Sequence, residues 1–364
     1  MYISQTVFLE RRLSMKAAVW HGAKDIRVKD VDLKPLQDNE VTVKVAWTGI
    51  CGTDLHEYLE GPVYVPTEGP DPLLGGQAPI TLGHEFAGVI ERIGKKVTNY
   101  QVGDHVAINP TVTNADRPSD IDVYSGYSFI GLASDGGFAS HANIPEDNLV
   151  RLPKNFPLRL GAVIEPAAVA VQAIKRNGLT FGQNVAIFGA GPIGCLVAAA
   201  AKAAGANRII ICDLSPQRLA KALELGATDT INSGEQDPVQ RIKELVPGGV
   251  DASFEVAGVQ VTFNQAILAT KPLGTMTLVS IFGHPIEFNP MILTNTGVKI
   301  TSTIAYSQAT FLETAELITK GSLQVEPVIT KEIPLDDIVT DGFEALTTDK
   351  SQAKILVNLD GLNN

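Results

Sequence analysis

The chain has few cysteines, no cluster of basic residues and no long apolar run. Only three cysteines occur among 364 residues, an odd number that does not make a disulfide framework and suits a reducing cytoplasm. The formal net charge is −11, without a local group of Lys and Arg, which argues against nucleic acid or an anionic membrane as a partner. No apolar stretch approaches the roughly 18–20 residues of a membrane span. We therefore expect a cytoplasmic globular protein.

The first fourteen residues stand apart from the rest. They carry Glu10, Arg11 and Arg12, and their apolar stretch is too short for a signal peptide. A strand-like run begins at Met15, which we interpret as the natural first residue. Residues 1–14 are therefore predicted to be a disordered extension.

The pattern of predicted secondary structure in the remaining sequence changes near residue 160. Before it, short β-rich runs alternate with Gly and Pro, which predicts strands at 16–20, 40–47, 86–93, 105–108, 138–142 and 149–152. After it, strands and helices alternate, which predicts strands at 185–188, 208–213, 229–232, 250–255, 275–281 and 299–305. This alternation is typical of a doubly wound parallel sheet. Short runs return near 326–331 and 354–359, so the tail is predicted to rejoin the first domain.

A glycine-rich motif gives the second domain a function. Gly189, Gly191 and Gly194 follow an apolar strand and open a helix, with Pro192 and Ile193 between them. This is G-x-G-x-x-G in the strand–turn–helix context of a dinucleotide site. The glycines permit a tight turn, close approach of a pyrophosphate and close packing of the helix on the sheet, and the helix start supplies N–H groups.

Asp213 ends the next predicted strand, about 20 residues after the motif. Its carboxylate is expected to accept hydrogen bonds from the adenosine ribose and to repel a 2′-phosphate, so we predict NAD rather than NADP. Arg218, at the start of the next helix, is expected either to lie against the adenine or to face water.

Three further segments carry the residue types of a metal site. Cys51 lies between polar residues and glycine, His84 and Glu85 follow 33 residues later, and Glu165 stands before a proline at the domain junction. A thiolate, an imidazole and a carboxylate with one open position are typical of catalytic zinc. Such a metal acts as a Lewis acid toward an alcohol oxygen.

The order of these motifs resembles the zinc-dependent medium-chain alcohol and polyol dehydrogenases, over residues 15 to about 359. The resemblance rests on Cys-Gly-Thr-Asp-Leu-His at 51–56, Gly-His-Glu-Phe-Ala-Gly at 83–88, Glu-Pro at 165–166 and the glycine motif. It implies an α/β protein with a Rossmann NAD-binding domain (166–305) and a discontinuous GroES-like catalytic domain (15–165 and 306–364). The segments 49–62, 253–256 and 350–357 resemble most the branch that interconverts 2,3-butanediol, in its R,R form, and acetoin and that reduces diacetyl.

The resemblance also assigns roles. Cys51, His84 and Glu165 match zinc ligands, and Glu85 matches a position that either binds zinc or lies behind it; which glutamate binds directly stays open. Asp54 matches a carboxylate that orients the histidine. Thr53 matches the hydroxyl that contacts the substrate oxygen, and His56 matches the solvent end of a proton relay. Relatives are homodimers or homotetramers, and an edge strand near 299–305 is the expected contact.

One departure from the family is visible. Many relatives hold a second, structural zinc on four cysteines, but residues 109–137 contain none, so one catalytic zinc per subunit is expected. Two alternatives remain open. One is a sibling dehydrogenase that acts on a sugar alcohol such as sorbitol, and the other is a non-catalytic NAD-binding scaffold.

Overall fold

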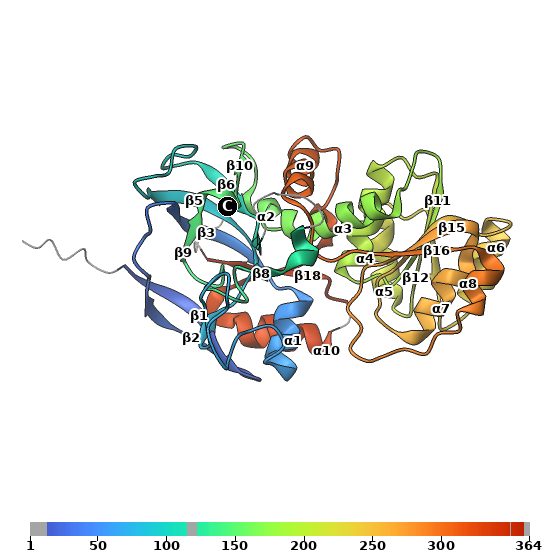
Figure 1. Ribbon diagram of the computed structural model, residues 1–364, viewed down its shortest axis with the longest axis horizontal. Coiled ribbons are helices and arrows are strands. Elements are labelled where there is room, and N and C mark those ends of the chain that lie inside the picture. Colours follow the sequence, from blue (N-terminus) through green and yellow to red (C-terminus); the bar gives the residue numbers. More distant parts are fainter. Residues whose placement is uncertain (1–12, 115–121, 350, 360–364) are drawn as a thin grey trace, which may run out of the picture.

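The computed structural model describes residues 13–114, 122–349 and 351–359. The predicted extension lies mostly outside this range. Its last residue, Ser14, is described and begins strand β1 (Ser14–Gly22). Figure 1 shows two lobes joined through helices α2 (Leu158–Gly161) and α3 (Ile164–Asn177).

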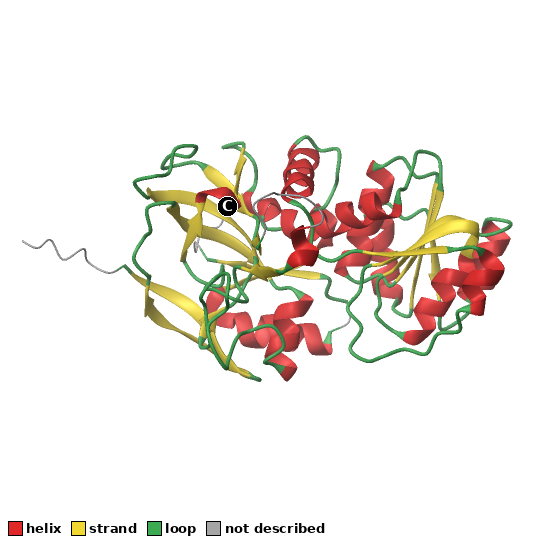
Figure 2. Ribbon diagram, viewed as in Figure 1, coloured by secondary structure: helices red, strands yellow, loops and turns green. Residues whose placement is uncertain are grey.

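The β-rich lobe contains both the first and the last strands of the chain (Figures 1 and 2). One sheet has the order β2-β1-β4; a larger one has the order β10-β6-β5-β3-β18-β17, with β9 also paired to β3; β7 and β8 form a hairpin. Besides β1, its strands are β2 (Asp25–Asp32), β3 (Glu40–Gly49), β4 (Ile80–Thr81), β5 (Glu85–Ile93), β6 (His105–Ile108), β7 (Thr111–Thr113), β8 (Tyr127–Phe129), β9 (His141–Pro145), β10 (Leu149–Leu152), β17 (Ile329–Pro334) and β18 (Lys354–Asn358).

Strand β3 is the centre of this lobe because it is buried on both faces. Val41, Val43 and Val45 belong to one apolar core. The pairing with β5 shifts between Val45 and Trp47, and Ala46 and Trp47 then join the core that also contains residues of α3. This face anchors the β-rich lobe to the helix that connects it to the second lobe.

The tail returns to the first lobe at its central strand. Leu356 of β18 pairs with Gly49 of β3, next to the segment that carries Cys51. The expected strand at 326–331 begins only at Ile329, because residues 326–328, which include Pro327, form a 3-10 turn. The exact domain boundaries stay a prediction.

The parallel-sheet lobe has the strand order β13-β12-β11-β14-β15-β16. Its strands are β11 (Asn184–Phe188), β12 (Arg208–Asp213), β13 (Asp229–Asn232), β14 (Val250–Glu255), β15 (Thr270–Leu278) and β16 (Lys299–Ser302). The chain runs outward from β11 to β13 and then returns to β14 beside β11. This reversal is the topological switch point at which α/β sheets bind ligands. The predicted doubly wound sheet is confirmed.

Helices cover both faces of this sheet. Val185 and Ile187 of β11 face the core that contains α4 (Pro192–Ala203), whereas Ala186 and Phe188 face the opposite core. Alternation along a strand sends successive side chains to opposite faces. The other helices of the lobe are α5 (Pro216–Glu224), α6 (Pro238–Leu245), α7 (Gln260–Ala269) and α8 (Met291–Thr296).

The first lobe was predicted to contain only strands and loops, but it also contains helices. Helix α1 (Gly52–Glu60) follows β3 directly, and the strand expected at 138–142 is instead β9 at His141–Pro145. Helix α9 (Gln308–Thr319) and several shorter segments complete the fold: α10 (Ala345–Thr348), η1 (Asp122–Ser125), η2 (Glu146–Asn148), η3 (Glu326–Val328), η4 (Leu335–Asp337) and the π-segment η5 (Ile338–Glu344). In the part of the chain that is described, no helix has the length and apolarity needed to cross a bilayer.

Candidate metal and coenzyme site

Cys51 lies at the start of helix α1, where its backbone is extended and precedes the first helical residue. Asp54 in the first turn accepts a hydrogen bond from the Cys51 N–H at 3.0 Å. Such a cap satisfies a donor that the helix leaves unpaired. Thr53 lies beside the thiol, with 3.8 Å between Oγ1 and Sγ, whereas the side chain of His56 on the same helix is exposed.

His84 immediately precedes β5 and is buried. Its Nδ1 lies 3.4 Å from Oδ1 of Asp54, which is fully buried. Neither of these two atoms has a hydrogen-bond partner within the described residues. Burial alone lowers the pKa of His84, but the charges of Asp54 and Cys51 together raise it by more than burial lowers it. The net shift of the pKa is therefore well upward. Because Nδ1 faces Asp54, Nε2 is the ring nitrogen left for a ligand.

Glu85 opens β5 and is held by a lysine from the other end of the chain. Lys354 Nζ lies 2.7 Å from both carboxylate oxygens of Glu85, and it also donates to the Ile50 carbonyl at 3.0 Å. Burial lowers the pKa of Lys354, but Glu85 and Cys51 raise it more, and the net shift is upward. Gly49 faces this carboxylate across the β3–β5 pair, and any side chain there would overlap Glu85.

Glu165 lies in the first turn of α3 and is buried. Its Oε1 accepts a hydrogen bond at 2.7 Å from the hydroxyl of Tyr306, which is itself buried. Burial raises the pKa of Glu165 to about 7, aided by Glu85 and opposed by His84, Tyr306 and Lys354. A carboxyl group with this pKa is poised between its neutral and charged forms at neutral pH.

Three of the four predicted ligands converge. Ligand atoms of Cys51, His84 and Glu85 all lie within 4.8 Å of one another, and no other such group of His, Cys, Asp and Glu is found in the described part of the chain. A sulfur, an imidazole nitrogen and a carboxylate oxygen form a zinc-type donor set. Glu165 lies outside this three-residue group, although its pKa responds to the charges of His84 and Glu85.

The glycine-rich segment forms the turn between β11 and α4. Gly189 has a φ of +111°, a conformation that strongly favours glycine. A side chain on Gly194 would collide with the Gly189 carbonyl, whereas one on Gly191 would meet nothing within 4 Å. Gly191 caps α4, Pro192 is its first residue and Ile193 follows. The turn therefore leaves open space at the start of a helix.

Asp213 ends β12 beside this turn. Its Oδ2 accepts from the Ala190 N–H at 2.8 Å, and its Oδ1 accepts from the Ser215 N–H at 2.9 Å. Arg218 lies in α5, and its N–H donates to the Ser215 hydroxyl that caps this helix. The acid is thus fixed between the glycine turn and the next helix start.

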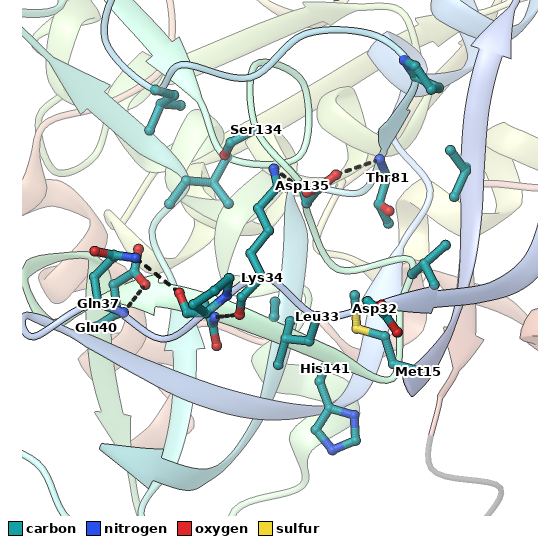
Figure 3. Close-up of a pocket in the computed structure, with 18 of the residues that line it drawn as sticks. Met15, Asp32, Leu33, Lys34, Gln37, Glu40, Thr81, Ser134, Asp135 and His141 are labelled. Atoms are coloured by element: carbon teal, nitrogen blue, oxygen red, sulfur yellow. Dashed lines mark hydrogen bonds and ion pairs between the residues drawn. The ribbon is translucent and has the colours of Figure 1, made fainter. Parts of the chain in front are cut away.

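A separate pocket of about 410 Å³ lies in the β-rich lobe, lined by residues of β1, β2, β9 and neighbouring loops (Figure 3). Lys34 and Asp135 form an ion pair of 2.7 Å at its edge, and Asp135 also accepts from the Thr81 N–H. Met15, Leu33 and His141 also line it (Figure 3). None of the predicted site residues lines this pocket, so it is distinct from the metal and coenzyme residues.

Sequence reasoning missed two residues of the site. Lys354 stands at the start of an apolar strand, and Tyr306 lies in a linker after β16. Lys354 lies in the segment 350–357 that carries the family resemblance, but no role was assigned to it, because a lysine that begins an apolar strand equally fits an exposed strand end. Tyr306 belongs to none of the motifs identified in the sequence.

The fold and the site together define a dehydrogenase of the zinc-binding class, and comparison with known proteins agrees. Residues 37–154 match the family described as alcohol dehydrogenase GroES-like domain, and residues 192–320 match the family described as zinc-binding dehydrogenase. The chain belongs to this family of zinc-binding medium-chain alcohol dehydrogenases, so the predicted family, fold class and enzyme class are confirmed.

Particular relatives narrow the similarity. The chain is 41% identical over 344 residues to the (R,R)-butanediol dehydrogenase of Bacillus subtilis (strain 168), covering 94% of this chain and 99% of the relative. A crystal structure of 2R,3R-butanediol dehydrogenase from Bacillus subtilis matches with a TM-score of 0.89 and 40% identity, over 95% of this chain and 99% of that one. A sorbitol dehydrogenase of Bacillus subtilis (strain 168) is 31% identical over 353 residues, covering 94% of this chain and 97% of the relative.

Proposed function

We propose that this chain is an NAD- and zinc-dependent dehydrogenase that interconverts (R,R)-2,3-butanediol and acetoin and reduces diacetyl to acetoin. The observation that carries the proposal is the convergence of Cys51, His84 and Glu85, whose ligand atoms lie within 4.8 Å of one another. The near full-length similarity to a butanediol dehydrogenase supports the choice of substrate. The reaction removes a hydride from the carbinol carbon and a proton from its hydroxyl, leaving a ketone.

Cys51, His84 and one carboxylate would hold the zinc. Zinc supplies Lewis acidity that lowers the pKa of a substrate hydroxyl. Distance favours Glu85 as the third ligand, but Lys354 occupies both of its oxygens. Glu165 is the other candidate, and Tyr306 holds one of its oxygens. One zinc per chain is proposed, with no structural zinc.

Thr53 and His56 would move the proton. The Thr53 hydroxyl lies next to the Cys51 sulfur and so beside the proposed metal. We assign to it a relay role, in which its oxygen would accept the substrate hydroxyl proton while its own proton is passed on toward solvent, so that the threonine stays neutral. His56 is exposed on the same helix, so it can exchange that proton with water. Asp54 orients His84 from behind.

The coenzyme would lie at the carboxyl ends of the parallel strands. Bound NAD accepts the hydride. The N–H groups at the start of α4 would bind its pyrophosphate, with Gly189, Gly191, Pro192, Ile193 and Gly194 shaping the turn. Asp213 would bind the adenosine ribose and select NAD, and Arg218 lies near that end.

A substrate panel with metal analysis tests this proposal. The purified protein is assayed with the three stereoisomers of 2,3-butanediol, acetoin, diacetyl, sorbitol and threonine, each with NAD(H) and with NADP(H). We expect one zinc per chain and the highest kcat/KM for (R,R)-2,3-butanediol with NAD. A preference for sorbitol would favour the second candidate, to which the 31% identical relative points. NADH binding without turnover of any of these compounds would favour a scaffold.

Assembly and location are part of the same proposal. Strand β16 is the last strand of its sheet and pairs only with β15 in the described structure. An unpaired edge can extend a sheet into a second subunit, which fits a homodimer or homotetramer. The cytoplasm would keep Cys51 reduced and able to bind the metal.

A further inference from the structure

Glu255, the last residue of β14, is a fully buried acid whose partners are neutral donors. Its Oε1 accepts from the N–H of Ala257 at 2.9 Å, the N–H of Gly258 at 2.8 Å and the hydroxyl of Thr262 at 2.7 Å. Its Oε2 accepts from the hydroxyl of Ser280. Burying a carboxylate is costly unless donors replace water, and hydrogen bonds to a charged acceptor are stronger than neutral ones.

The first segment that Glu255 holds lies against the glycine-rich turn. Glu255 pairs with Phe188, which directly precedes Gly189, and the Val256 N–H donates to the Phe188 carbonyl at 2.9 Å. A Cβ on Gly189 would lie 3.1 Å from the nitrogen of Ala257. Residues 256–258 therefore form the wall that faces the turn across the switch point between β11 and β14.

The second segment follows the neighbouring strand β15. The N–H groups of Val279 and Ser280 donate to the Glu255 carbonyl at 3.0 and 3.3 Å, in addition to the Ser280 hydroxyl on the carboxylate. A Cβ on Gly258 would lie 2.7 Å from the carbonyl oxygen of Ile281. One side chain thus joins residues 256–258 to residues 279–281, at the carboxyl ends of two adjacent strands.

We propose that Glu255 is a positioning residue for the nicotinamide half of the coenzyme. A dinucleotide lies across the crevice at the switch point. Asp213 is on the β12 side of β11, and the start of α4 is at the centre, so the other half must extend over β14 and β15. The two segments held by Glu255, residues 256–258 and 279–281, lie at the ends of β14 and β15 and so form the nicotinamide side of the site. This inference rests on the proposed coenzyme and adds a residue that selectively supports one half of its site.

Titration with two ligands distinguishes effects on the nicotinamide half of the coenzyme site from effects on the adenosine half. The zinc-loaded full-length protein is titrated with NADH, followed by its fluorescence, and with ADP, followed by calorimetry, because ADP lacks the nicotinamide half. Glu255→Met keeps the side-chain length but leaves the Ala257 and Gly258 N–H groups without an acceptor. We expect its Kd for NADH to rise about tenfold or more, with the Kd for ADP and the zinc content unchanged.

Matched variants complete the design. Glu255→Gln retains an acceptor for the three donors of Oε1, and its amide can donate to the Ser280 oxygen, so NADH binding should recover to within about threefold of wild type. Glu244→Met, which removes an exposed acid on α6, is expected to change neither Kd. Thr262→Val and Ser280→Ala each remove one donor and should weaken NADH alone by about two- to fivefold.

The outcomes are distinguishable. If wild type does not bind NADH, the proposed function itself fails. If wild type binds NADH and Glu255→Met binds it equally well, or loses NADH and ADP affinity in parallel, the positioning role is overturned while the proposed function stands. If Glu255→Met does not fold, Thr262→Val and Ser280→Ala decide: selective weakening of NADH supports the role, and unchanged NADH affinity in both overturns it.

Discussion

The two lobes hold their polar groups in different ways. In the β-rich lobe, the buried Glu85 of the proposed metal site is held by a side chain distant in sequence, that of Lys354, 269 residues away. In the parallel-sheet lobe, the acids at the strand ends bind nearby backbone N–H groups. Asp213 accepts from Ser215, and Glu255 accepts from Ala257 and Gly258.

Because of this difference, substitutions in the two lobes should affect different functions of the protein. The metal residues depend on the whole β-rich lobe, including a strand near the end of the chain. The coenzyme residues depend on short loops at the ends of β11, β12 and β14. Variants in one lobe should therefore remove metal and leave coenzyme binding, and variants in the other should do the reverse.

The largest effect is expected for Cys51→Ala. Loss of the thiolate should remove the zinc and lower kcat/KM for the diol by about 10³-fold or more, because several kcal/mol of Lewis-acid stabilisation are lost. The Kd for NADH should stay within about threefold of wild type. Metal analysis, steady-state kinetics and NADH titration on one preparation check this. Full activity without bound metal would contradict the account.

Lys354→Met tests the long-range pair. It leaves Glu85 buried without its cation, and breaking a buried pair costs about 3–5 kcal/mol of unfolding free energy. Urea unfolding of the metal-free protein measures this loss. Adding Glu85→Gln to Lys354→Met removes the unpaired charge and should restore at least half of the stability. Equal stability of Lys354→Met and wild type would show that the pair is energetically unimportant.

The pH dependence of stability tests the environment of Glu165. Burial raises its folded-state pKa from 4.5 to about 7, so the unfolded chain releases this proton first as the pH rises. The group costs nothing below about pH 4.5 and destabilises the metal-free fold by about 3 kcal/mol once the pH exceeds 7. Glu165→Gln should therefore gain stability relative to wild type between pH 5 and 8. A difference independent of pH would contradict the raised pKa.

Asp213→Ser tests the coenzyme side. Without the carboxylate, repulsion of a 2′-phosphate disappears, and the ratio of kcat/KM for NAD to that for NADP should fall about tenfold. Zinc content should not change. An unchanged ratio would mean that another group selects the coenzyme.

The smallest effect is expected for His56→Asn. Because His56 is exposed and acts only as the outer end of the relay, the variant should mainly displace the pH profile of kcat and leave KM, zinc and NADH binding near wild type. Rate profiles between pH 6 and 10 measure this. A superimposable profile would remove His56 from the relay.

The contrast between the lobes also explains what the sequence could predict. The glycine turn and Asp213 form a contiguous pattern, because a helix start and adjacent parallel strands impose fixed spacing, and the doubly wound sheet follows from the alternation of its elements. Cys51, His84 and Glu85 were identified by residue type and by resemblance to a family. The contacts of Lys354 and Tyr306 could not be predicted, since they arise only when β18 pairs with β3 and when the linker after β16 packs on α3.

The most direct test of the central claim is zinc X-ray absorption on the purified, active protein, with metal quantified per chain. We expect one zinc per chain, bound by one sulfur at about 2.3 Å and otherwise by nitrogen and oxygen, with the sulfur contribution lost in Cys51→Ala. A tetrathiolate spectrum is impossible for one chain with three cysteines. A spectrum without sulfur, or zinc well below one per active chain, would contradict the claim that Cys51, His84 and a glutamate form the metal centre.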